Sequence, residues 1–162
     1  MVLQYIKNHM GMKLTEEQMA DIPHAFPELV SHVIIKNIQA FGMLGTFLVG
    51  PVWAASSKST RNLPGLAAKC TKAGRVGVVM SFFTGPAMTY FTVKGNEEIK
   101  IYDRCFRLRH NRKQVRVDQA SIIGGLSGAA IGASQANPTL GFLVGMTSGV
   151  LGAAAYNSKQ DK

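Results

Sequence analysis

Residues 117–156 read VDQASIIGGLSGAAIGASQANPTLGFLVGMTSGVLGAAAY, and this stretch decides the fold class. Within it, glycines recur at intervals of four in two ladders of three: Gly124, Gly128, Gly132, then Gly141, Gly145, Gly149. Residues four apart lie on one face of an α-helix, so each ladder gives its helix a flat face with exposed backbone. In water an interior glycine costs a helix about 1 kcal/mol relative to alanine, whereas in a bilayer small residues at this spacing allow helices to pack closely. The ladders therefore predict two packed transmembrane helices.

The distribution of charge along the chain extends this prediction. Charged residues are absent from residues 38–57, 76–93 and 119–158, and Lys and Arg are concentrated between those stretches. Such segregation is what a bilayer requires, although the mean hydropathy of +0.09 alone does not decide between a soluble and a membrane protein. The expected fold is an all-α membrane protein with four transmembrane helices and Gly/Ala-rich packing, spanning about residues 33–55, 76–93, 120–136 and 139–156.

The segments outside the expected spans are polar. Residues 1–32 form a polar N-terminal segment in which Thr15 and Gln18 make a capping-box pattern, so a short helix is expected before Pro23. Residues 56–74 are expected to be a loop, either without regular structure or with a helical turn over residues 66–72, and residues 157–162 are expected to be a polar tail. Residues 94–118 predict a basic amphipathic helix, lying in the headgroup region or against a partner.

The net charge of +9 also fits a nucleic-acid-binding protein. The positive residues flank apolar spans, however, and that placement favours attraction to anionic lipid headgroups over a nucleic-acid groove. Lipid or partner contact is expected from five arginines: Arg104, Arg107, Arg109, Arg112 and Arg116. Lys36, near the start of the first span, is expected to anchor the helix at the interface.

The sequence offers no catalytic constellation. The expected spans contain no carboxylate or histidine, and His24, His32 and His110 lack metal-ligand spacing, so we expect no catalytic residue, no metal and no cofactor. Two cysteines, Cys70 and Cys105, are too few for a disulfide framework and are expected to be unpaired thiols.

With catalytic, metal and cofactor sites not expected, the candidate functional residues are those that pack helices together. The expected packing residues are the six ladder glycines together with Gly125. Their partners are either helices of this chain or helices of another protein, because the same geometry serves both. Arg116 and Asp118 are expected to form a local ion pair at the start of the third span.

The stretch that begins with Arg116 and Asp118, followed by the glycine ladders, resembles the glycine-rich hairpin of the Tim family of mitochondrial inner-membrane proteins. Within that family the closer likeness, over about residues 60–156, is to the four-span accessory subunit of respiratory complex I, NADH:ubiquinone oxidoreductase. The resemblance implies a multi-pass protein of the mitochondrial inner membrane that is not itself an enzyme. It would be an accessory subunit of the respiratory electron-transport chain, holding membrane-arm subunits together.

The implied partners are other complex I subunits, complex III in a supercomplex, and anionic lipid such as cardiolipin, with no nucleic acid. The alternative function is a component of a mitochondrial protein-import translocase. Orientation stays open, because the count of positive residues in the loops favours termini inside, whereas the resemblance implies termini in the intermembrane space.

Overall fold

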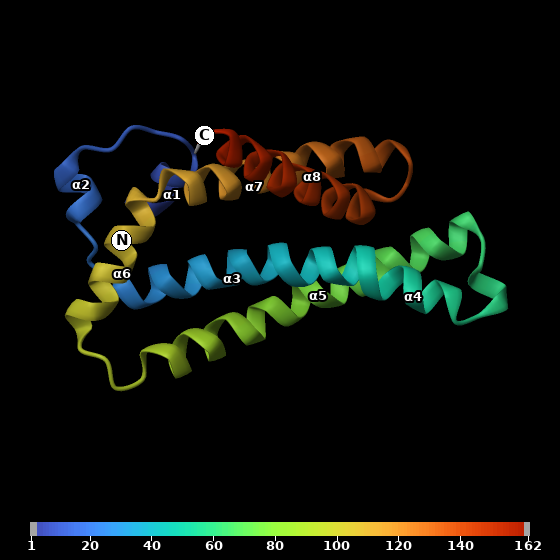
Figure 1. The fold of residues 1–162 in the computed structure, drawn as a ribbon, viewed down its shortest axis with the longest axis horizontal. Helices are drawn as coiled ribbons and strands as arrows, with labels where there is room; N and C mark the ends of the chain where they lie inside the picture. Colours follow the sequence, from blue (N-terminus) through green and yellow to red (C-terminus); the bar gives the residue numbers. More distant parts are fainter. Residues whose placement is uncertain (1–2, 161–162) are drawn as a thin grey trace.

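The computed structural model describes residues 3–160, which form helices and no strand (Figure 1). The helices are α1 (Leu3–His9), α2 (Glu16–Ala20), α3 (Ala25–Leu44), η1 (Gly45–Val49), α4 (Gly50–Ala55), η2 (Lys58–Thr60), α5 (Leu63–Val93), α6 (Glu98–His110), α7 (Arg112–Ser134) and α8 (Pro138–Lys159). The expectation of an all-α protein is thus confirmed for these residues. Residues 161–162 of the expected tail and 1–2 of the N-terminal segment lie outside the described part.

The first expected span lies in a continuous helical stretch made of α3, η1 and α4. The middle element is a turn of π-helix, in which the Gly50 amide donates to the Gly45 carbonyl five residues earlier. Pro51 follows directly and has no amide hydrogen to donate into a regular α-helix, so a widened turn before it lets the helix continue. The stretch runs from Ala25 to Ala55, eight residues longer at its start than the expected span.

The second expected span is the distal part of α5, a helix of 31 residues. The helical turn expected over residues 66–72 belongs to α5, which begins at Leu63, so the loop ends earlier than the expected residue 74. Asn62 caps this helix: its side chain accepts a hydrogen bond of 2.7 Å from the Gly65 amide. In Figure 1, α5 runs antiparallel to α3 and α4 along most of their length.

The third and fourth expected spans form the α7–α8 hairpin. Asn137 joins them, and its side chain accepts a hydrogen bond of 3.1 Å from the Leu140 amide, which caps α8. The chain reverses through Ala136, whose φ of 54° lies in the left-handed region. Helix α7 starts at Arg112, well before the expected residue 120, so the last part of the basic segment, residues 112–118, and the first glycine ladder belong to one helix, while α6 holds the earlier part.

At one end of the helices, α1, α2 and α6 pack together (Figure 1). The capping box is confirmed, since the Thr15 side chain accepts from the Gln18 amide and the Gln18 side chain accepts from the Thr15 amide. Between α2, α3 and α6 lies a small core of Ile22, Ala25, Leu29, Val93 and Cys105. The apolar face of α6 covers this core, so it contacts its own chain where we had expected headgroups or a partner.

Three helical stretches within residues 3–160 are long and apolar enough to cross a membrane: Ala25–Ala55, Leu63–Val93 and Pro138–Lys159. Helix α7 does not meet that standard, because its uncharged part is short and rich in glycine, alanine and serine. Large apolar side chains are exposed along these helices, such as Phe47, Phe83, Phe91, Ile123 and Leu151. Exposure on this scale is typical of a lipid-facing surface.

Candidate functional site

The two glycine ladders face each other inside the α7–α8 hairpin. A Cβ atom on Gly128 would overlap the Gly141 carbonyl oxygen, and one on Gly141 would overlap the Gly128 carbonyl oxygen. The same reciprocal overlap joins Gly124 and Gly145. Since main-chain atoms occupy the place of each missing side chain, the helices touch backbone to backbone.

The remaining predicted packing glycines have the same role. A Cβ on Gly132 would lie 2.6 Å from the Asn137 carbonyl oxygen, one on Gly149 would overlap the Ala120 carbonyl oxygen, and one on Gly125 would meet the Phe142 ring. Of the two partners considered for the ladders, the structure places a helix of the same chain in each groove. The outward faces of the hairpin therefore carry other side chains.

The hairpin is joined to α3 through Asp118, which is 1% exposed. The Lys36 ammonium is bonded to Asp118 Oδ1, and Gln39 Nε2 donates to that oxygen at 2.9 Å. Gln39 Nε2 also lies 2.8 Å from Ser121 Oγ, one turn further along α7. The Asp118 carboxylate thus gathers donors from α3 at the point where the charged part of α7 gives way to the glycine ladder.

Helix α1 contributes to the same cluster. His9 Nε2 lies 3.4 Å from the second carboxylate oxygen of Asp118, and His32 Nδ1 of α3 lies 3.9 Å from it. We name these residues the Asp118 cluster: His9, His32, Lys36, Gln39, Asp118 and Ser121. The cluster ties three helices that are far apart in the sequence.

This geometry corrects two expectations. Asp118 pairs with Lys36 across helices and not with Arg116 on its own helix. Lys36 consequently turns inward and is not a free interfacial anchor. Arg116 instead donates to the Asn157 side chain and stacks 4.8 Å from the centre of the Tyr156 ring, so it holds the end of α8.

Arg109 has a structural role, which corrects its assignment as a lipid or partner contact. Its side chain is fully buried, and it binds Glu28 in a bidentate pair with distances of 2.7 Å from Nε and 2.5 Å from Nη2. Its Nη1 donates to three backbone carbonyl oxygens, those of Gln18, Met19 and Asp21. One guanidinium thereby fixes α6 to α3 and to the end of α2.

The other arginines of this segment remain at the surface. Arg107 is exposed and forms an ion pair with Asp103 one turn earlier on α6, at 2.9 Å. Arg112 donates to Asn8 Oδ1 at 3.2 Å and is also exposed. Arg104 is half-buried beside a shallow pocket next to His32. These three residues can still meet an anionic headgroup or a partner carboxylate.

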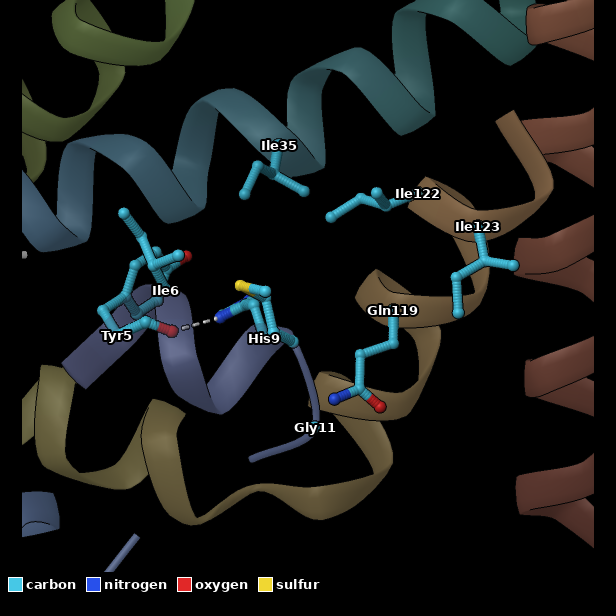
Figure 2. Close-up of a pocket in the computed structure, with 9 residues that line it drawn as sticks. Tyr5, Ile6, His9, Gly11, Ile35, Gln119, Ile122 and Ile123 are labelled. Carbon is cyan, nitrogen blue, oxygen red and sulfur yellow. Dashed lines mark hydrogen bonds between the residues drawn. The ribbon is translucent and has the colours of Figure 1, made fainter. Parts of the chain in front are cut away.

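Beside the Asp118 cluster lies a mainly apolar pocket of about 470 Å³ (Figure 2). Its lining comes from α1, α3 and α7: Tyr5, Ile6, His9, Met10, Gly11, Ile35, Gln119, Ile122 and Ile123. Burial, and next the negative charge of Asp118, raise the pKa of Tyr5 above its usual range, so its phenol stays neutral. A neutral, largely apolar wall suits a hydrophobic ligand or an acyl chain.

Sequence reasoning missed the cluster because its members come from three distant segments. One signal was present: His32, Lys36 and Gln39 recur at intervals of four and three, which puts three polar residues on one face of an otherwise apolar helix. Cys70 and Cys105 were expected to be unpaired, and both are free thiols.

Comparison with models of protein families gives a match that covers most of the chain. The family described as "Protein of unknown function (DUF1757)" matches residues 5–156, which include α1, the Asp118 cluster and the glycine hairpin. No curated protein matches the sequence. Because the match covers nearly the whole sequence, this chain belongs to the DUF1757 family.

Proposed function

We propose that this protein is a non-catalytic structural subunit of the membrane arm of mitochondrial respiratory complex I. The observation that carries the proposal is the α7–α8 hairpin, in which every ladder glycine contacts backbone within its own chain. A hairpin closed in this way is a rigid unit. Its outer face is apolar and largely exposed, with Ile123, Leu126 and Ile131 all more than 60% exposed.

The exposed apolar face of α7 is an argument that this helix is a fourth membrane-spanning helix. A helix whose outward side chains are isoleucine and leucine is suited to lipid or to an apolar protein surface. The end of α8 lies beside the start of α7, since Asn157 Nδ2 donates to the Lys113 carbonyl oxygen at 3.0 Å. Likewise α1 lies on α6, since Asn8 Nδ2 donates to the Arg109 carbonyl oxygen at 3.1 Å. Both terminal helices thus pack at one end, which an even number of crossings requires.

Two buried ion pairs of the protein agree with a structural role. The Arg109–Glu28 pair and the Lys36–Asp118 pair each join different helices, so they hold the fold together. The resemblance of residues 60–156 to the four-span complex I subunit supplies the particular complex and the mitochondrial inner membrane. The partners are then neighbouring complex I subunits, complex III in a supercomplex, and cardiolipin at the half-buried Arg104 and the exposed Arg107 and Arg112.

The test is the migration of the tagged protein on native gels of solubilised mitochondria. The proposal expects it with complex I and with complex I–III supercomplexes, and it expects the membrane arm to be depleted when the protein is removed. A pool found with import translocase subunits would favour the alternative function. Release from membranes by carbonate extraction would contradict both, because an integral protein stays in the pellet.

A further inference from the structure

Two buried acceptors face each other in the Asp118 cluster. His9 Nδ1 lies 3.1 Å from the Tyr5 carbonyl oxygen, which can only accept, so Nδ1 carries the proton (Figure 2). In the neutral ring, Nε2 then presents a lone pair to Asp118 Oδ2 at 3.4 Å. Both atoms are buried, and neither has a hydrogen-bond partner among residues 3–160. Such an arrangement is unfavourable unless a positive species lies between the two atoms.

We propose that His9 Nε2, His32 Nδ1 and Asp118 Oδ2 bind a divalent transition-metal ion of the zinc type. The three donor atoms lie within 4.8 Å of one another. Metal–ligand distances of about 2.0–2.2 Å in a tetrahedral site place neighbouring donors about 3.4 Å apart. The distances of 3.4 Å and 3.9 Å from the two ring nitrogens to Asp118 Oδ2 need only a small closing movement, and the two ring nitrogens, which lie within 4.8 Å of each other, need one of at most about 1.4 Å. A proton would bridge only two of these atoms, whereas a metal ion would be bound by all three.

The surroundings match those of a metal-binding histidine. The hydrogen bond from Nδ1 to a backbone carbonyl fixes the ring orientation and tautomer, as is usual for ligating histidines. His9 also lines the pocket of about 470 Å³, which gives room for a water molecule or a small ligand in the fourth position. Two nitrogen donors and one oxygen donor suit Zn²⁺ better than Mg²⁺ or Ca²⁺, which prefer oxygen.

Lys36 acts as a competitor of the metal ion. Its ammonium is bonded to the other oxygen of Asp118 and so neutralises the one negative charge of the site. A divalent ion bound nearby would be repelled by that ammonium. Removing the lysine charge should therefore strengthen metal binding, whereas a lysine that only supported the cluster structurally would weaken binding when removed.

The test uses the full chain purified in detergent and stripped with a chelator, titrated with Zn²⁺ by calorimetry and with Co²⁺ by visible absorption. We expect one ion per chain. His9→Ala, His32→Ala and Asp118→Asn should each weaken binding by at least about tenfold, and Lys36→Met should tighten it. His24→Ala is the matched control, since His24 is exposed at the start of α3, and its binding should equal that of the wild type.

Three results would overturn the proposal. One is the absence of saturable binding to the wild-type chain, which would mean that a proton, and not a metal ion, lies between His9 and Asp118. Another is binding that survives in both His9→Ala and Asp118→Asn. The third needs no variant: a sulfur-to-cobalt charge-transfer band would place the ion at Cys70 or Cys105. Circular dichroism of each variant checks that it is folded before its affinity is compared.

Discussion

Replacing Gly128 by alanine tests the backbone contact between α7 and α8. The new methyl group would overlap the Gly141 carbonyl oxygen, and it would lie 3.0 Å from both the Gly141 carbonyl carbon and the Gly145 Cα. Unstrained carbon–carbon contacts lie at about 3.5–4.0 Å, so the carbon contacts alone require a separation of roughly 0.5–1 Å, and the overlap with the carbonyl oxygen requires at least about 1 Å. The obstructing atoms are main chain and cannot rotate away. Overpacking of this kind costs about 1–3 kcal/mol, of which the higher helix propensity of alanine recovers up to about 1 kcal/mol.

Gly152→Ala provides the control for this prediction. Gly152 lies on the same hairpin, and no atom of the described part of the chain comes within 4 Å of a Cβ atom placed there. The free energy of unfolding, measured in detergent micelles by circular dichroism against denaturant, should fall for Gly128→Ala and stay equal or rise for Gly152→Ala. Equal changes in the two variants would refute the claim that the ladders hold the hairpin together.

Two further predictions concern the end at which α6 packs. Arg109→Met leaves Glu28 buried without its partner and should lower the free energy of unfolding by about 3–5 kcal/mol. Arg107→Met removes an exposed ion pair and should change the free energy of unfolding by less than about 1 kcal/mol. Comparable losses in the two variants would contradict the structural role of Arg109. Burial raises the pKa of the fully buried Cys105 thiol to about 12 from 9.0, so maleimide should label it at pH 8 only in the unfolded chain. Its folded pKa lies above its unfolded pKa, so its contribution to stability should be lost as pH rises from about 9 towards 12; rapid native labelling would contradict this.

The helical hairpin could be predicted from sequence because local spacing fixes it. A ladder of glycines at intervals of four specifies a helix face whatever the rest of the chain does, and Asn137-Pro138 marks the turn between the two helices. Helix starts were less predictable. Residues 63–75 carry Lys69, Lys72 and Arg75, which indicate a loop at a membrane surface, yet a capped helix can extend beyond the bilayer and carry those charges in water.

The site could not be predicted in the same way because its contacts are long-range. Arg109 stands among surface arginines in the sequence, and only the position of Glu28, 81 residues away, distinguishes it as buried. Asp118 has Arg116 close by in sequence, but on a helix residues two apart point in different directions. Lys36, which belongs to another helix, is therefore its partner. Local sequence spacing shows which side chains are charged and near each other along the chain, but it does not show which helix supplies the ion-pair partner.

Photo-crosslinking in native mitochondria tests the central claim most directly. A crosslinking amino acid placed at Leu126 on α7 or at Phe83 on α5, both exposed, samples the apolar outer surface, and Ser81, which is fully buried, is the control. The account predicts mass-spectrometric identification of complex I membrane-arm subunits from Leu126 or Phe83 and no crosslinked partner from Ser81. Adducts to import-translocase subunits, or to lipid alone from both exposed positions, would contradict it.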